Sequence, residues 1–384
     1  MLFKAVRHLG SKGPASHSDA RALLLTTTLA LVAIGLMMVL SASSFELAAQ
    51  GKSPYETFYK QALWVGIGLA VLVVFSRLPL HLFRRYAGLI LIGSFVLTLL
   101  VFTPLGIEVN GNRNWIGIGP ITVQPSEFLK LGTIIWGANV LARRTRSSRN
   151  LRPFLFPVLP VSLAAVALVL AGKDLGTAAI LVLIIAGLFF FAGASLTVFG
   201  AGLAVFALAA FAAVISSSNR TSRISAWLDP ASAGTAEGLG YQGVQATYGL
   251  AGGGMFGVGM GQSRQKVHWI PEAHNDFIFA VLGEELGFVG AAVMLILFAT
   301  LAFAIYRIAT LSGELHVTLI CGGALVWILA QTVLNISVVT GLVPVVGVPL
   351  PFISYGGSSM ISLLALTGVL LSCSRHSERT ATNN

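Results

Sequence analysis

The side chains best suited to chemistry stand where long apolar segments begin. Asp276 lies at the start of one such segment, and Glu284 and Glu285 follow inside it. A carboxylate beside an apolar surface can accept a proton from a hydroxyl group, so Asp276 is a candidate general base. Ionisable groups within an apolar span are costly and are therefore functional or tightly paired. For Glu284 and Glu285 we favour structural pairing.

A second polar cluster surrounds Pro125, which marks the start of another apolar segment. Glu127 and Lys130 are three residues apart, so on a helix they share a face and can form an ion pair. Ser126 is a candidate cap for that helix. Two interpretations stay open: a capped helix with a snorkelling lysine, or a cationic lining for a phosphate group, supplied by Arg113 and Lys130.

Two glycine-containing stretches are ambiguous. Lys173-Asp174-Leu175-Gly176-Thr177 predicts a tight turn that caps the next helix. The long segment 217–276 is rich in glycine and serine and carries the basic candidates Arg223, Arg264 and Lys266. Its Gly-x-Gly-x-Gly spacing is a weak dinucleotide signal, and no strand precedes it, so we reject a Rossmann site.

The last polar stretch, 344–359, interrupts an apolar region with proline and paired glycine and includes Ser358. Such interruptions imply a broken helix, which membranes tolerate only where it faces protein or a cavity. This points to a site at one membrane surface.

The elements that must position these residues are membrane helices. The chain has 384 residues, of which 55% are hydrophobic and 10% charged, whereas soluble domains carry about 25% charged residues. Uncharged blocks of about 18 residues or more predict membrane-spanning helices, and a β-barrel would show short alternating segments instead. We therefore predict an all-α, polytopic membrane protein of about ten helices, at 22–44, 59–76, 86–104, 126–142, 153–171, 177–193, 196–216, 277–306, 316–340 and 352–373.

The net charge of +10 comes from basic residues between these spans, not from one soluble face, which argues against nucleic acid as a partner. The positive-inside rule places both termini and the 143–152 loop in the cytoplasm and the large 217–276 loop, between helices 7 and 8, outside. We divide the chain into a basic tail (1–21), a transmembrane domain (22–373) and a second cytoplasmic tail (374–384). The first span is too long for a signal-peptide core. Histidine spacing predicts no metal site, and the two cysteines stand in apolar stretches.

Four ordered motifs resemble the SEDS family, named for shape, elongation, division and sporulation. They are QPSEFLKL at 124–131, DLGT at 174–177, PEAHNDFIFAVLGEELG at 271–287 and GLVPVVGVPLPFISYGGSS at 341–359. Asn275 replaces the family's usual threonine and Lys173 its usual proline, and both changes keep the neighbouring acidic residue. The Gly-Glu-Glu at 283–285 is similar to the division branch, and His-Asn-Asp at 274–276 to actinobacterial members.

The resemblance implies ten helices and a glycosyltransferase that polymerises lipid II into peptidoglycan at the outer face of a bacterial cytoplasmic membrane. It implies an essential role for Asp276. The partners it implies are lipid II, the growing lipid-linked glycan, a class B penicillin-binding protein acting as transpeptidase, other divisome proteins and membrane lipid. We expect a multi-pass protein at the division septum.

In that reaction an acceptor hydroxyl displaces undecaprenyl pyrophosphate. An α-linked donor giving a β-linked product fits one inverting displacement with Asp276 as base. Charge on the leaving group calls for basic side chains or, as an open alternative, for a divalent cation as cofactor, Mg²⁺ or Mn²⁺. The substrate-binding candidates are Arg113, Glu127, Lys130, Arg223, Arg264, Lys266 and Ser358.

Two other functions stay open. A lipid II flippase would need polar residues along the whole membrane depth, and Gln331 and Asn335 are amides that would line such a path. A non-catalytic scaffold would recruit a transpeptidase, and Asp276 would then be dispensable for glycan synthesis.

Overall fold

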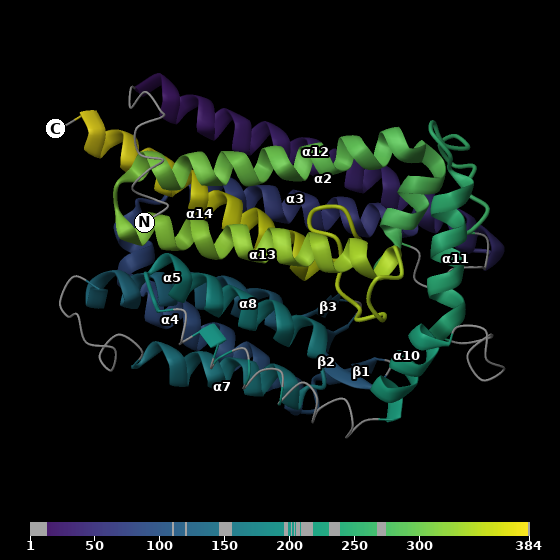
Figure 1. Cartoon of the computed structure of the whole chain (residues 1–384), viewed down its shortest axis with the longest axis horizontal. Helices are drawn as coiled ribbons and strands as arrows, with labels where there is room; N and C mark the ends of the chain where they lie inside the picture. Colours follow the sequence, from purple (N-terminus) through teal and green to yellow (C-terminus); the bar gives the residue numbers. More distant parts are fainter. Residues whose placement is uncertain are drawn as a thin grey trace.

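The computed structural model describes residues 14–109, 111–119, 121–145, 156–195, 199, 200, 202, 204, 208, 218–229, 239–266 and 274–382. Long helices lie side by side and form one elongated bundle (Figure 1). One end of the bundle, here called the sheet end, carries a small β-sheet and two crossing helices. The other end, here called the tail end, is where the first described helix begins and the last one finishes.

Among the described residues, six helices are long and apolar enough to cross a membrane. They are α2 (Pro14–Ala49), α3 (Glu56–Arg77), α4 (Leu80–Leu99) with its 3-10 extension η1 (Leu100–Phe102), α12 (Ile278–Ser312), α13 (Leu315–Val339) and α14 (Gly357–Thr382). Most of α14 is buried, and it packs against α2, α3, α5 and α12. The all-α membrane class predicted from the sequence is therefore confirmed.

Three further helices complete the described part of the bundle: α5 (Pro125–Thr145), α7 (Val158–Ala171) and α8 (Leu175–Phe191). The last two are apolar but shorter than a full span. The first carries Glu127, Lys130, Arg143 and Arg144 and packs against α4, α8 and α13. The predicted span 196–216 lies largely outside the described residues, so the total of ten stays a prediction.

The helices extend beyond the apolar spans predicted from hydropathy, most clearly at the two termini. The first helix begins at Pro14, ahead of the span 22–44, and the last ends at Thr382, past the span 352–373. Arg21 and Glu378 form an ion pair that joins these two extensions at the tail end. Hydropathy marks where the apolar stretch stops, whereas a polar helix can continue when its side chains are paired. The tails 1–21 and 374–384 are thus partly helical.

The predicted loop 105–125 contains a three-stranded antiparallel sheet that sequence reasoning missed. Its strands are β1 (Gly106–Val109), β2 (Asn112–Ile118) and β3 (Ile121–Val123), in the order β1-β2-β3. Gly111 and Gly119 lie at the two connections with φ of +79° and +63°, a backbone region that glycine enters without steric cost.

The 217–276 segment also differs from the predicted loop. It contains α10 (Ser218–Leu228) and α11 (Leu239–Gly252), which stand across the sheet end (Figure 1). After α11, the glycine run docks on α12 through main-chain hydrogen bonds, from Val258 N to the Glu284 oxygen at 2.9 Å and from Phe288 N to the Gly254 oxygen at 2.8 Å. A Cβ at Gly287 would come within 2.3 Å of the Gly257 nitrogen. Glycine here permits backbone contact.

Candidate active site

Asp276 lies in the turn 274–277 that leads directly into α12, and it is half-buried. The loop before α14 faces it: the position of a Cβ on Gly347 would be 3.5 Å from Asp276 Oδ2. That loop, 340–356, is non-helical and includes Phe352 with φ of +64°. The interruption predicted from proline and glycine is confirmed, and it lies beside the candidate base.

Three consecutive main-chain oxygens of the turn accept hydrogen bonds from the C-terminal part of the chain. Tyr355 N donates to His274 O at 3.0 Å, and Ser354 Oγ donates to Asn275 O at 2.7 Å. Asn335 Nδ2, on α13, donates to Asp276 O at 2.8 Å. The turn 274–277 is therefore fixed by hydrogen bonds to segments that are distant from it in sequence.

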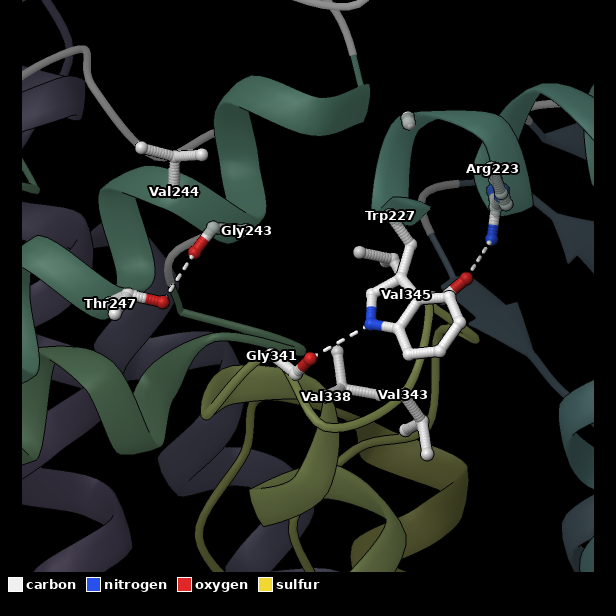
Figure 2. A pocket seen from close by; sticks show the side chains of 10 residues that line it. Arg223, Trp227, Gly243, Val244, Thr247, Val338, Gly341, Val343 and Val345 are labelled. Carbon is white, nitrogen blue, oxygen red and sulfur yellow. Dashed lines mark hydrogen bonds between the residues drawn. The ribbon is translucent and has the colours of Figure 1, made fainter. Parts of the chain in front are cut away.

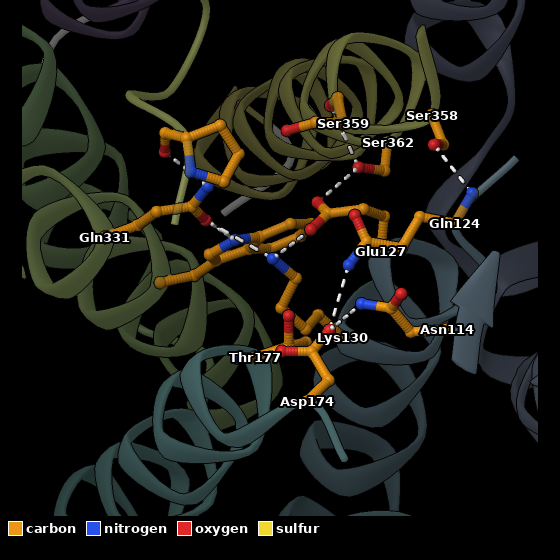
Figure 3. A network of polar contacts seen from close by, with 12 residues as sticks. Asn114, Gln124, Glu127, Lys130, Asp174, Thr177, Gln331, Ser358, Ser359 and Ser362 are labelled. Atoms are coloured by element: carbon orange, nitrogen blue, oxygen red, sulfur yellow. Dashed lines mark hydrogen bonds and ion pairs between the residues drawn. The ribbon is translucent and has the colours of Figure 1, made fainter. Parts of the chain in front are cut away.

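The predicted pairing of Glu127 with Lys130 is confirmed. Lys130 Nζ lies 2.7 Å from Glu127 Oε1, and both side chains are 2% exposed. The ammonium group also lies 3.3 Å from Gln331 Oε1 and 4.7 Å from the centre of the Trp327 ring. Figure 3 shows the pair enclosed between helices, with Ser362 reaching Glu127 from α14. The lysine is buried and does not snorkel, so its assignment, with Glu127, to direct substrate contact needs correction.

Arg113 has a structural task at the end of η1. Its Nε donates to Val101 O at 3.0 Å and its Nη2 to Thr103 O at 2.8 Å. A cation is favourable at the negative C-terminal end of a helix. Arg113 and Lys130 therefore bind separate parts of the fold and do not build the joint cationic lining considered from the sequence.

Asp174 caps α8, which confirms the interpretation of its segment as a capping turn. Its Oδ1 accepts from Thr177 N at 2.9 Å, and its Oδ2 accepts from Asn114 Nδ2 at 2.8 Å and Gln124 Nε2 at 3.0 Å. Figure 3 shows these amides converging on the carboxylate. The buried Ser358 Oγ accepts from Gln124 N at 2.9 Å, so this predicted substrate-binding hydroxyl joins α14 to the segment before α5.

The two glutamates inside α12 are paired, as predicted. Glu285 Oε1 lies 2.9 Å from Lys266 Nζ, and Ser41 Oγ donates to the same carboxylate at 2.7 Å. Glu284 accepts from Ser263 Oγ and from Arg264 N. Lys266 is buried in this cluster, so its predicted contact with substrate also needs correction. The Arg264 side chain remains exposed.

A pocket of about 120 Å³ lies between α10, α11 and the end of α13. Figure 2 shows Arg223 and Trp227 above the loop 340–356, near Gly341 and Val345. Trp227 Nε1 donates to Gly341 O at 2.8 Å, and Arg223 Nη1 donates to Val345 O at 3.2 Å. Val345 is two residues from Gly347, so the loop connects this pocket to Asp276.

Three further residues build this arrangement: Trp227, which sequence reasoning missed, and Gln331 and Asn335, which it considered only as the lining of a flippase path. Gln331 Nε2 donates to Pro349 O, and Asn335 Nδ2 donates to Val348 O, each at 2.8 Å. A usable signal was present, because Trp327, Gln331 and Asn335 recur every four residues and hence share one face of a helix.

Metal binding has no preformed centre in the part of the chain that the structure describes. No three His, Cys, Asp or Glu side chains converge there. Carboxylates and water are the usual ligands of Mg²⁺, and four of the motif carboxylates, Glu127, Asp174, Glu284 and Glu285, are buried in other contacts. We therefore derive no step through a divalent cation.

Comparison with known proteins gives one family over nearly the whole chain. The model of the FtsW, RodA and SpoVE family, described as cell cycle proteins, matches residues 21–379. The probable peptidoglycan glycosyltransferase FtsW of Mycobacterium tuberculosis is 39% identical over 355 residues, which are 92% of this chain and 67% of that one. Stage V sporulation protein E of Bacillus subtilis is 38% identical over 356 residues, 92% of this chain and 97% of that one.

Solved structures agree. A chain from work on a peptidoglycan synthase complex that coordinates polymerization and crosslinking superposes with a TM-score of 0.75 at 28% identity, covering 94% of this chain and 98% of that chain. The rod shape determining protein RodA of Thermus thermophilus gives a TM-score of 0.68 at 27% identity, covering 92% and 95%.

Proposed function

The chain belongs to the FtsW, RodA and SpoVE family of cell cycle proteins, and we propose that it is a peptidoglycan glycosyltransferase that polymerises lipid II. Relatives 35–39% identical over most of the chain are named probable peptidoglycan glycosyltransferases. These names favour the division branch, which the Gly-Glu-Glu at 283–285 also resembles.

One observation carries the assignment of Asp276 as the base. Among the described carboxylates of the four motifs, Glu127, Asp174, Glu284 and Glu285 are buried, whereas Asp276 is half-buried at the junction of two loops. A general base must reach the hydroxyl proton of its substrate within hydrogen-bond distance, which a fully buried carboxylate cannot do.

In the proposed reaction the acceptor hydroxyl attacks C1 of the donor sugar as Asp276 takes its proton, and the bond from C1 to the pyrophosphate oxygen breaks. Inversion requires the base on the face opposite the leaving group. Arg223, at the pocket, and the exposed Arg264 are the cations we retain for the departing pyrophosphate. The other three cations stabilise the surrounding fold through the hydrogen bonds and ion pairs described above. They are Arg113, Lys130 and Lys266.

The chain is a membrane protein, and we propose that both termini are cytoplasmic, that the sheet end is external, and that it acts at the division septum. The proposed partner is a class B penicillin-binding protein within the divisome. Support for a partner of this kind comes from the similarity to a chain of a peptidoglycan synthase complex.

The test is polymer formation by the purified chain with its transpeptidase and labelled lipid II, followed by gel analysis of glycan length. We expect polymer with the native chain and none with Asp276→Asn that still binds the transpeptidase. A flippase or a scaffold would give equal polymer, or equal absence of polymer, from both proteins.

A further inference from the structure

A single amide joins the two loops that meet at Asp276. Asn335 lies on α13, and its side chain is 1% exposed. Its Nδ2 donates to the main-chain oxygens of Asp276 and Val348, both at 2.8 Å. One NH₂ group therefore connects the turn that carries the base to the loop that faces it.

The orientation of this amide follows from its neighbours. Both are carbonyl oxygens, which only accept hydrogen bonds, so the nitrogen must face them. Asn335 Oδ1 is then left buried, with no hydrogen-bond partner among the described residues. An unpartnered buried acceptor lowers stability and calls for an explanation. The amide accepts this loss and in return supplies one donor group to two main-chain oxygens of different segments, so its contribution lies in joining those segments.

The task is visible in the geometry of the base. Val348 follows Gly347, whose Cβ position would lie 3.5 Å from Asp276 Oδ2. By holding Val348 and Asp276 to one nitrogen, Asn335 fixes the distance between the carboxylate and the opposite loop. The carboxylate and an acceptor hydroxyl must share that space, and a shift of about 1 Å in a reacting group costs about 10²-fold in rate.

We propose that Asn335 is a positioning residue for glycan polymerisation, which sets the placement of Asp276 by clamping its carbonyl to that of Val348. This inference rests on the proposed function, in which Asp276 is the base. Asn335 touches the backbone of Asp276 and acts through it, so its removal slows the chemical step and leaves substrate affinity nearly unchanged.

The test uses the full chain with its transpeptidase and labelled lipid II, and compares Asn335→Ala with Asn335→Asp. We expect Asn335→Ala to lower kcat by about 10²-fold with KM close to the native value. Asn335→Asp should be worse despite its similar shape, because a carboxylate oxygen would face two carbonyl oxygens. If the side chain merely fills space, Asn335→Asp should be the more active of the two.

Asn139 provides a matched control at the tail end. Its Nδ2 donates to Arg84 O at 3.0 Å, and its side chain is also buried. Asn139→Ala should lower the unfolding temperature about as much as Asn335→Ala while polymerisation stays normal. Equal loss of kcat in both variants would assign the effect to general destabilisation and overturn the inference.

The remaining outcomes distinguish failure of the positioning role of Asn335 from failure of the proposed glycosyltransferase function. Normal kcat in both Asn335 variants, with Asp276→Asn inactive, would overturn the positioning role alone. Near-normal polymerisation by Asp276→Asn would overturn the proposed function and the inference with it.

Discussion

Lys130 Nζ lies 2.7 Å from Glu127 Oε1 inside the bundle, and both side chains are 2% exposed. Removing one partner of a buried ion pair leaves an uncompensated charge, which is typically destabilising by about 3–5 kcal/mol. The pair also touches Gln331, which holds Pro349 O. We therefore expect loss of this ion pair to disturb, through Gln331, the loop opposite Asp276.

The first prediction concerns this pair. Lys130→Met should lower the unfolding temperature of the purified chain strongly, because the Glu127 carboxylate stays buried without its cation. Lys60→Met is the matched control, since Lys60 and Glu56 form an ion pair on the exposed face of α3. Exposed pairs contribute little. Equal shifts in thermal unfolding for both variants would show that burial of the pair does not matter.

The second prediction concerns Asp276. Asp276→Asn should reduce polymerisation about 10²–10⁴-fold, because the shape is kept and the proton acceptor is lost. Asp276→Glu should also be slow, since one added methylene moves the carboxylate. Glu108→Gln, an exposed carboxylate on β1, should polymerise lipid II normally in the same gel assay. Activity of Asp276→Asn near that of this control would contradict the assignment.

The third prediction concerns Arg223. If its guanidinium binds the pyrophosphate, Arg223→Ala should raise KM for lipid II about tenfold or more, as expected for the loss of a charge-assisted hydrogen bond of about 1.5–3 kcal/mol. Trp227→Phe is the companion variant: it removes the hydrogen bond to Gly341 O but keeps an aromatic ring in the pocket. Initial rates across lipid II concentrations measure both. An unchanged KM in Arg223→Ala would remove this residue from the substrate site.

The fourth prediction concerns pH at the tail end. Burial raises the pKa of Glu314, but the hydrogen bond and charge of Arg84, with His376, outweigh it and lower that pKa below its ordinary value of 4.5. A carboxyl with a lowered folded pKa stabilises the fold above its unfolded pKa, and this contribution disappears as pH falls through the folded value. Native protein should thus lose thermal stability in acid more steeply than Glu314→Gln. Identical profiles of unfolding temperature from pH 7 downward would refute this.

The fifth prediction concerns topology. A cysteine replacing the exposed Glu108 on β1 should react with an impermeant thiol reagent added outside intact cells. A cysteine replacing the exposed Thr382 should react only after permeabilisation. Cys321 and Cys373 are buried and can remain in place. Labelling of position 382 in intact cells would reverse the proposed orientation.

Local patterns were sufficient for part of this protein. Hydropathy located the long helices because a membrane span is defined by its own run of apolar residues. Asp276 was correctly placed just before α12, and the spacing of Glu127 and Lys130 predicted their pairing because a helix brings residues three apart together. The capping role of Asp174 is equally local, since its Thr177 partner is three residues away.

Contacts between residues that are distant in sequence decide which polar side chains are held in buried structural contacts. Lys266 bonds Ser41 across 225 positions, and Asn335 bonds Asp276 across 59. From the sequence, five cations were equivalent candidates for binding a phosphate. In the folded chain, Lys130 and Lys266 pair with buried carboxylates, and Arg113 donates hydrogen bonds to carbonyl oxygens at the end of a helix. Which partner each charged side chain meets is set by which helices pack together, and residue type and spacing along the chain do not contain that information.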